Sequence, residues 1–563
     1  MYLIGIDVGG TFTDGALVKS GAIAATAKIA TDNHNISTSL FATLDQLLTA
    51  LPTSENIDRI VISTTVVTNL LVTEQVEPTA LILIPGYGLP NSYYEIGEYC
   101  YFLKGAMDFR GQEVEEIVPD EVAQCIKAIK KQNLKRIAIA GKFSNRNNSH
   151  EKLIRELIRK EYPEALVLIS SEISNQLNFA RRAATTYYTA VTYYEWNNFV
   201  DKVREAVQKR GINAEVQVLK ADGGTMPLEV SRSYPCQTIF SGPAASTMGG
   251  AALTMDKYNS VIIDIGGTTS DISLLIEGEP LYAAKGALIN ERYTHVEAFS
   301  LTSLPMGGDS EVVYINGNVE VLNKRQDLAV CFGGKFLTVT DIFNVGFALE
   351  IGDYQASQVA LETWAAEHNF ISQEITEEVI NIVLNKLTAA LNKMFREWEK
   401  EPAYKVWEVV NNRKFNLDRI IGIGAASTAI VPVLAKHLGV PYFLHKYSPI
   451  ANALGTAVAR PTLNISLHAD TEHGYYTIQP NGGLDKIINP HKFNLEDAKE
   501  LALNHLHIEL AARGIDEYGH EANFYLEEQF NVIRGWDRAG KIFDIGVQVK
   551  PGFIKEFMGV LER

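Results

Sequence analysis

An internal repeat is the feature that most constrains how this chain can fold. Residues 6–14 read IDVGGTFTD and residues 263–271 read IDIGGTTSD, with six of the nine positions identical. In each copy an apolar run precedes the Gly-Gly-Thr turn, a second apolar run follows it, and a Gly turn leads into a third run. This pattern is typical of a β-meander with tight turns. Two copies with the same turn chemistry predict two homologous halves.

Short apolar runs alternate with helical patterns through the first 460 residues, which predicts an α/β fold with mainly parallel core sheets. Buried strands are expected at Arg59–Ile62, Thr79–Ile84, Arg136–Ala140, Leu166–Ile169 and Val216–Leu219. Helices are expected at Glu121–Gln132, Ser149–Glu161, Ala183–Val207 and Thr376–Phe395.

Near Pro461 the pattern changes to a strand, a helix and further strands. The helix is expected over Leu495–Arg513, because Asn494 is a good N-cap and acidic residues occupy the first turn. We therefore expect a small C-terminal α+β domain. The resulting division is a first lobe with an inserted region, a second lobe with an insertion, and the small domain, at residues 1–240, 241–460 and 461–563.

The repeated turn suits phosphate binding. Glycines permit positive φ and lack Cβ atoms, so that successive N–H groups can converge on phosphate oxygens, and the Thr hydroxyl adds a donor. The Asp that closes the preceding strand can hold Mg²⁺ directly or through its waters. A single turn of this kind is usually only a turn. Two copies that face each other can bind the phosphates from both sides, so the repeat predicts a phosphate site.

Charge and cysteine content narrow the class of protein. The 51 basic and 67 acidic residues give a net charge of −16, which argues against nucleic acid or an anionic membrane as the main partner. It does not argue against ATP, because backbone N–H groups and Mg²⁺ can hold phosphates. The four cysteines form no CxxC pair, and neither a secretion signal nor a membrane-length apolar run is seen. We expect a cytoplasmic protein.

Two further small-residue motifs have a functional and a structural interpretation. The run IIGIGAAS (420–427) could let an adenine or ribose lie against the backbone of Gly422, Gly424 and Ala425, or it could simply allow close packing of a helix on a strand. The run SGPAAS (241–246) could supply backbone amides near a cleft, or it could start a helix with Ser241 as N-cap.

Several polar residues are candidates for contact with a substrate. Thr64, Thr65 and Asn69 could donate to a carbonyl oxygen, although a hydroxyl-rich strand-to-helix connection explains them as well. Asp222 could be a substrate-site carboxylate or part of an ordinary turn. Further candidates, each of which also has an ordinary structural explanation, are Arg181, Asp309 and Asp341.

The paired hairpins resemble those of the actin and sugar-kinase superfamily, whose two lobes close over ATP. Within it, most of residues 1–460 resembles the hydantoinase A/5-oxoprolinase family. The matching segments are DVGGTFTD (7–14), STTVVTNLL (63–71), ARRAATTYY (180–188), ADGGTMPLE (221–229), SGPAAS (241–246), DIGGTTSD (264–271), TVTD (338–341) and ANALGTAVA (451–459). The family's Gly-Gly-Gly-Ser stretch reads Gly307-Gly308-Asp309-Ser310 here, which inserts a carboxylate.

The resemblance implies two duplicated actin-like ATPase lobes, each a ribonuclease H-like β-meander plus helices, with a cleft between them. It implies Mg²⁺ and ATP-dependent phosphoryl transfer to the carbonyl oxygen of a small cyclic amide or imide, which a B-type partner subunit then helps to hydrolyse. Asp7 and Asp264 would organise Mg²⁺ and the attacking group. The phosphates would lie against Gly9, Gly10, Thr11, Gly266, Gly267, Thr268 and Thr269.

Three other activities remain open from the sequence. The chain could be the ATP-hydrolysing subunit of a ketone carboxylase or a small-molecule kinase, since both need the same phosphate site. It could instead be a nucleotide-gated assembly protein that closes on ATP without a metabolite. A homo-oligomer is possible in each case.

Overall fold

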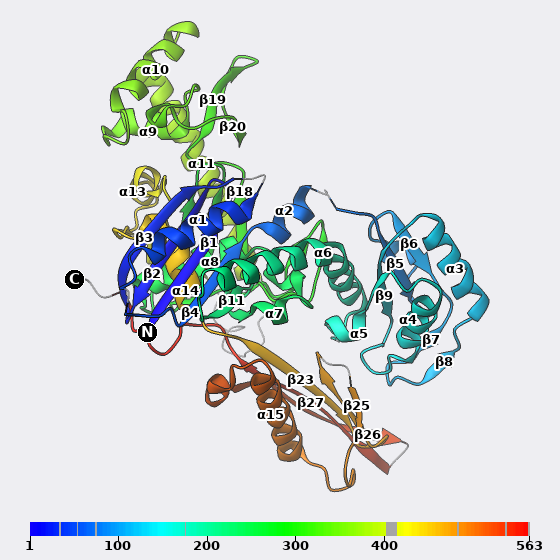
Figure 1. Ribbon diagram of the computed structural model, residues 1–563. Helices are drawn as coiled ribbons and strands as arrows, with labels where there is room; N and C mark the ends of the chain where they lie inside the picture. Colours follow the sequence, from blue (N-terminus) through cyan, green and yellow to red (C-terminus); the bar gives the residue numbers. More distant parts are fainter. Residues whose placement is uncertain are drawn as a thin grey trace.

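Two β-sheets with corresponding strand orders form the cores of the two lobes, and the first of them lies near the centre of the view in Figure 1. The computed structural model describes all residues except 33, 34, 53, 74, 75, 175, 401–413, 481, 482, 535, 536 and 561–563. The first sheet is ordered β12 (Thr225–Pro227), β11 (Glu215–Leu219), β4 (Arg59–Thr64), β1 (Tyr2–Val8), β2 (Phe12–Lys19) and β3 (Ala22–Ala30). The second is ordered β15 (Glu279–Pro280), β14 (Ser270–Ile276), β13 (Ser260–Ile265), β21 (Arg419–Ile423) and β22 (Tyr442–Phe443), with β18 (Leu301–Leu304) also paired to β14.

Each sheet contains one copy of the repeat. β1 is antiparallel to β2 and parallel to β4, and β13 is antiparallel to β14 and parallel to β21. In both sheets the meander lies on one side of the first strand and the parallel strands lie on the other. This shared topology confirms the predicted α/β fold with two duplicated lobes.

Helices cover both sheets and join them. The first lobe has α1 (Ile36–Leu48), α2 (Val66–Thr73), α6 (Phe179–Lys209) and the short α7 (Leu228–Ser231); the second has α11 (Ser372–Glu399) and α13 (Ser427–Leu438). α8 (Ser241–Thr254) contacts β4 of the first sheet and β13 of the second, and α14 (Ala451–Val458) contacts both β1 and α8. These two helices therefore connect the lobes.

The crossing of α8 and α14 depends on glycine. A Cβ atom added to Gly455 would lie 2.3 Å from the backbone nitrogen of Gly249, a separation that only a missing side chain permits. One role of the glycine-rich sequence is thus to bring the two connecting helices into backbone contact.

Each lobe carries an insertion. Between α2 and α6, the strands β6 (Tyr99–Phe102), β5 (Thr79–Ile84), β9 (Arg136–Gly141) and β10 (Leu166–Ile169) form a parallel sheet with α3 (Pro119–Lys131), α4 (Ser149–Glu161), α5 (Ser170–Ile173) and the hairpin β7 (Ala106–Met107)–β8 (Glu113–Glu115), drawn in cyan in Figure 1. The second lobe carries the small hairpin β16 (Leu288–Ile289)–β17 (Arg292–Tyr293) and an insertion with the hairpin β19 (Ser310–Ile315)–β20 (Asn318–Arg325), α9 (Val339–Phe347) and α10 (Tyr354–Glu367).

The C-terminal region forms an antiparallel sheet covered by one long helix. Its strands are ordered β25 (Gly483–Lys486), β24 (Tyr475–Gln479), β23 (Leu463–Asp470), β27 (Asp537–Val549) and β26 (Asn523–Arg534), and α15 (Leu495–Ala512) packs against β23 and β27. The Asn494 side chain accepts hydrogen bonds from the N–H groups of Glu496 and Asp497, as the sequence predicted for this helix start.

The expected strands and helices are present, although α6 and α11 extend beyond the predicted limits. The prediction of Ser241 as an N-cap is wrong. Ser241 is the first residue of α8, the preceding Phe240 has φ 55°, and the Ser241 hydroxyl instead donates to the carbonyl oxygen of Thr64 over 2.9 Å. Among the described residues, none of the helices combines the length and the hydropathy that a transmembrane span requires.

Candidate functional site

A cavity of about 580 Å³ lies between the two lobes, and both copies of the repeat line it. We call residues 7–14 the first hairpin and residues 264–271 the second hairpin. The cavity is lined by the following predicted site residues: Asp7, Gly9, Gly10, Thr11, Thr65, Asp264, Gly266, Gly267, Thr268, Thr269, Gly424 and Ala425. The fold thus brings most of the predicted site together in one place.

Each hairpin carries two carboxylates. The strand register places Asp7 opposite Asp14 and Asp264 opposite Asp271, and residues directly opposite each other in an antiparallel pair lie on the same face. All four line the cavity. From the sequence, only the first Asp of each copy was predicted to have a role. The identical final Asp of the nine-residue repeat was the signal that would have found Asp14 and Asp271.

Asn452 links the two hairpins. Its side-chain amide lies 3.3 Å from Oδ2 of Asp7 and 3.1 Å from Oδ2 of Asp264, and donates to both. Ser246, in the first turns of α8, donates to the same Oδ2 of Asp264 over 2.5 Å. The connecting helices α14 and α8 therefore hold the two carboxylates in a fixed relation. Neither residue was predicted as part of the site.

The site is short of positive charge. Burial raises the pKa of Asp7 to about 7, assisted by the charges of Asp14 and Asp264 and opposed by hydrogen bonds from Ser63 and Asn452. Burial also raises the pKa of Asp271 to about 7 and the pKa of Asp264 above its ordinary value. These carboxyl groups resist ionisation because burial removes them from water, and the nearby hydrogen bonds and positive charge do not compensate for that loss.

Lys28 places a positive charge beside the first hairpin. Lys28, on β3, forms an ion pair of 2.6 Å with Asp14. It opposes the effect of burial, which nevertheless raises the pKa of Asp14 above its ordinary value. Lys28 was not predicted from the sequence, because it belongs to the third strand of the meander and lies outside the nine-residue repeat.

The residues fit a bound divalent cation. Among the described residues, the buried Oδ1 atom of Asp7 has no hydrogen-bond partner, and a buried acceptor without a partner is costly. Carboxylate oxygens are preferred ligands of Mg²⁺, and a cation here would also offset the repulsion among the clustered carboxylates. Asp7 and Asp264 are thus well placed to hold Mg²⁺, directly or through its waters.

The hairpin turns have the same backbone geometry. The N–H of Gly9 donates to the carbonyl of Phe12 over 3.1 Å, and the N–H of Gly266 donates to that of Thr269 over 3.0 Å. These two N–H groups close the turns, so they are not the donors that we expected for phosphate. A Cβ on Gly10 would meet nothing within 4 Å, which places open space beside the tip of the first hairpin.

The turn after β21 borders the second hairpin. Gly424 has φ 81°, and a Cβ there would lie 2.2 Å from Oδ1 of Asp264, so glycine is required both for the backbone conformation and for the close approach. Gly422, which we also predicted as a nucleotide contact, does not line this cavity. It lies within β21, where an added Cβ would meet Leu444 and Val431, so the packing interpretation applies to it.

The predicted substrate residues of the first lobe are only partly at the cavity. Thr65 lines it. Thr64 is buried, and its backbone N–H and carbonyl both bond to the Ser241 hydroxyl. Asn69 is exposed on α2 and donates from its side chain to the Thr65 hydroxyl over 3.3 Å. The hydroxyl-rich segment therefore mainly joins β4 to α2 and α8.

Arg181 and Asp222 lie at other hollows of the molecule. Asp222 accepts hydrogen bonds from Lys220 Nζ and from the N–H of Gly224, both over 2.9 Å, as a turn-forming residue would. Arg181 lines a separate cavity of about 720 Å³ formed with residues 278–299 and the C-terminal region, and its guanidinium lies 5.9 Å from the centre of the Tyr293 ring. The fold does not bring these two residues to the hairpins.

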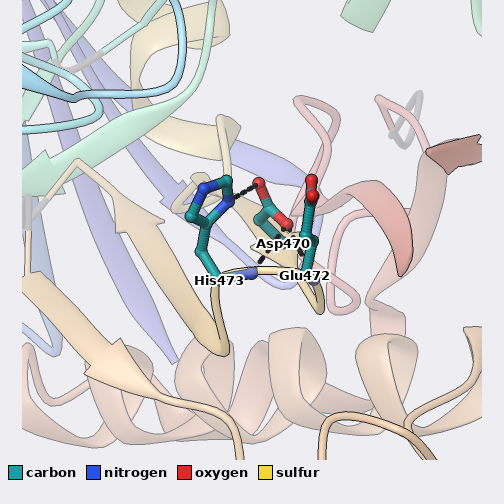
Figure 2. Close-up of side chains that lie close together, drawn as sticks. All are labelled: Asp470, Glu472 and His473. Carbon is teal, nitrogen blue, oxygen red and sulfur yellow. Dashed lines mark hydrogen bonds and ion pairs between the residues drawn. The ribbon is translucent and has the colours of Figure 1, made fainter. Parts of the chain in front are cut away.

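A second group of potential metal ligands is held by protein contacts. Figure 2 shows Asp470, Glu472 and His473 at the turn after β23. Asp470 accepts from the N–H groups of Glu472 and His473 and from Nδ1 of His473 over 2.9 Å. Glu472 forms an ion pair of 2.8 Å with Arg110 of the first-lobe insertion. The group thus forms a turn and fixes the C-terminal sheet to that insertion.

Comparison with known proteins places most of the chain in one family. Residues 182–465 match the family described as hydantoinase/oxoprolinase, and residues 3–162 match its N-terminal region. The chain is 23% identical over 55% of its length to the caprolactamase subunit alpha of Pseudomonas jessenii, and 24% identical over 54% of its length to the acetophenone carboxylase gamma subunit of Aromatoleum aromaticum. The matches cover only 48% and 47% of those relatives, so the chain spans about half their length.

Two solved structures share the fold across nearly the whole chain. A nucleotide-free acetone carboxylase structure superposes with a TM-score of 0.70 at 16% identity, covering 99% of this chain and 89% of that one. The ATP-dependent caprolactamase of Pseudomonas jessenii superposes with a TM-score of 0.69 at 17% identity, covering 97% of this chain and 87% of that one. At these identities the likeness concerns the fold alone.

Proposed function

Because this chain belongs to the hydantoinase/oxoprolinase family, we propose that it is an ATP-binding subunit that activates the carbonyl group of a small cyclic amide or imide. Ring-opening hydrolysis would follow with a B-type partner subunit. The observation that carries the proposal is the pair of hairpins, which face one cavity from two lobes and bring four carboxylates to it.

We place ATP in this cavity. The triphosphate would lie between the tips of the two hairpins, against the backbone and hydroxyl groups of Thr11 and Thr268. The nucleoside would extend toward Gly424 and Ala425, which line the same cavity. Mg²⁺, held by Asp7 and Asp264, would neutralise charge on the phosphates.

The protein's part in the reaction is positioning and electrostatics. The carbonyl oxygen of the amide would attack the terminal phosphorus of ATP, forming an O–P bond as the bond to the ADP oxygen breaks. Thr65 borders the cavity and is the predicted substrate residue best placed to donate to that carbonyl oxygen. Phosphorylation would make the amide carbon electrophilic, which prepares it for attack by water with the partner subunit.

The test is ATP turnover by this chain reconstituted with its B-type partner. We expect turnover to rise when a lactam or a hydantoin is added, together with ring-opened product and ADP in equal amounts. The absence of stimulation by every cyclic amide in the reconstituted pair would contradict the proposal.

A second candidate is the ATP-hydrolysing subunit of a ketone carboxylase. The acetophenone carboxylase gamma subunit is as similar to this chain as the caprolactamase subunit is, which favours it as an alternative. Both candidates would use ATP to phosphorylate a substrate oxygen. The first reaction ends in hydrolysis of a cyclic amide, and the second ends in carboxylation of a ketone. Turnover that depends on bicarbonate and a ketone would select the carboxylase.

A further inference from the structure

An ion pair lies between the tips of the two hairpins. Asp309, in the loop between β18 and β19, has its Oδ2 atom 3.3 Å from Nε of Arg325 at the end of β20. Arg325 also donates from Nη1 to the hydroxyl of Thr11 over 3.1 Å. The guanidinium therefore extends from the insertion of the second lobe across the cleft to the tip of the first hairpin.

The Asp309 carboxylate occupies the space between the hairpin tips. A Cβ on Gly267 would lie 2.4 Å from Oδ2 of Asp309 and 3.7 Å from the hydroxyl oxygen of Thr11, so both atoms lie close to one point at the second tip. The loop is fixed there, because the N–H of Asp309 donates to the carbonyl of Gly267 over 2.9 Å. This is the space in which we place the phosphates of ATP.

The charges in this space would let Arg325 bind either the Asp309 carboxylate or a phosphate group. A carboxylate beside the phosphate-binding backbone would repel a triphosphate unless a cation were shared with it. Arg325 is that cation, and a planar guanidinium binds carboxylate and phosphate with similar geometry. Burial raises the pKa of Asp309, while the Arg325 charge and the N–H of Ala329 oppose the shift.

We propose that Arg325 is a phosphate-binding residue that leaves Asp309 for the terminal phosphate when ATP enters the cleft. Asp309 is the competing anion that holds the guanidinium in the arrangement seen in this structure. The inference rests on the proposed ATP site and adds to it a means of distinguishing ATP from ADP. It also links the β19–β20 hairpin of the second lobe to nucleotide binding.

The experiment measures binding of Mg²⁺ with a non-hydrolysable ATP analogue, and separately with ADP, by titration calorimetry on the full chain. In Arg325→Gln we expect the affinity for the analogue to fall by about tenfold and that for ADP to fall much less, because only the analogue has the terminal phosphate. Lys324→Gln is the matched control, because it removes the same charge from an exposed neighbouring position. It should leave both affinities unchanged.

Asp309→Asn gives a prediction of opposite sign. Removing the competing anion should raise the affinity for the ATP analogue by about threefold, and this gain should disappear in the double variant with Arg325→Gln. The affinity of Arg325→Lys for the ATP analogue should lie between that of the wild type and that of Arg325→Gln. Thermal unfolding of each variant checks that the fold is intact.

Several outcomes would overturn the inference. Equal losses of affinity for the ATP analogue and for ADP in Arg325→Gln would assign Arg325 a purely structural role. Unchanged affinity for both would show that Arg325 does not bind the phosphates. Weaker binding in Asp309→Asn would show that Asp309 supports the nucleotide and does not compete with it. If the wild-type chain binds neither nucleotide, the proposed ATP site itself is wrong.

Discussion

The two hairpins have the same sequence pattern, the same register and the same turn, yet their surroundings differ. The first hairpin is partly neutralised by the ion pair of Lys28 with Asp14. The carboxylates of the second receive hydrogen bonds from the hydroxyl groups of Ser246 and Ser303, with no ion pair to a lysine or arginine among the described residues. Duplication therefore preserved the backbone, whereas the surrounding elements made the two sites electrostatically unequal.

The unequal sites suggest a division of labour. Asp7 is more deeply buried than Asp264, and its Oδ1 atom has no hydrogen-bond partner among the described residues, whereas Oδ2 of Asp264 accepts hydrogen bonds from two donors. The first hairpin is thus the better candidate for direct metal contact, and the second for holding the cleft geometry. Four experiments would test this difference.

The largest effects are expected from Asp7→Asn and Asp264→Asn. Both remove negative charge from the proposed Mg²⁺ site, and we expect ATP turnover to fall by about a thousandfold in Asp7→Asn and by somewhat less in Asp264→Asn. Steady-state ADP release measures the loss. Asp120→Asn, at an exposed position of α3, is the control. Full activity in both site variants would remove our assignment, and a larger loss in Asp264→Asn would reverse the comparison.

The next effect concerns the link between the hairpins. Asn452→Leu removes the amide that donates to both Asp7 and Asp264, so the carboxylates would separate or take up protons. We expect a loss of about a hundredfold in kcat/KM. If Asn452 mainly sets the geometry of the cleft, kcat should fall more than nucleotide affinity. An affinity loss with unchanged kcat would contradict that role.

Lys28→Gln tests the difference in charge directly. It leaves Asp14 without its cation, which should raise the pKa of that carboxyl further and weaken nucleotide binding by about tenfold. The loss should grow as the pH rises, because an ionised Asp14 without its neighbouring cation repels the phosphates of ATP. Lys19→Gln, at the far end of β2, is the matched control. Equal losses in both variants at every pH would exclude a specific role for Lys28.

The smallest effect concerns stability without metal. Asp7 and Asp271 hold protons in the folded state up to about pH 7, whereas their ordinary pKa is 3.8, so stability from these groups is present at low pH and is lost as the pH rises through 7. Asp271→Asn removes one such group and should raise the melting temperature at pH 8 by about 2 °C. At pH 4 the gain should be absent. A gain independent of pH would indicate a packing effect instead.

Local sequence was sufficient for the hairpins themselves. The Gly-Gly-Thr turns, the order of the flanking strands and the Asn494 helix start follow from residues close together in the chain, and the structure contains all of them. The repeat marks Asp7, Asp264 and the tip residues twice, and the structure brings them to one cavity. The final Asp of each copy carried the same signal.

Long-range contacts decided the rest of the site. Asn452 is 445 residues from Asp7 along the chain and Arg325 is 314 residues from Thr11, and these contacts form only when α14 and the β19–β20 hairpin pack against the cleft. Conversely, Gly422, Asp222 and Arg181 belong to suggestive motifs, but strand packing, a local turn and the course of α6 place them elsewhere.

Local sequence is enough to specify two copies of one Gly-Gly-Thr turn, because backbone conformation there depends on nearby glycines and strand periodicity. The differences between the copies arise from tertiary contacts. Burial, the position of a single lysine and the donors contributed by the connecting helices set the charge state of each carboxylate, and these depend on which distant segments meet in space.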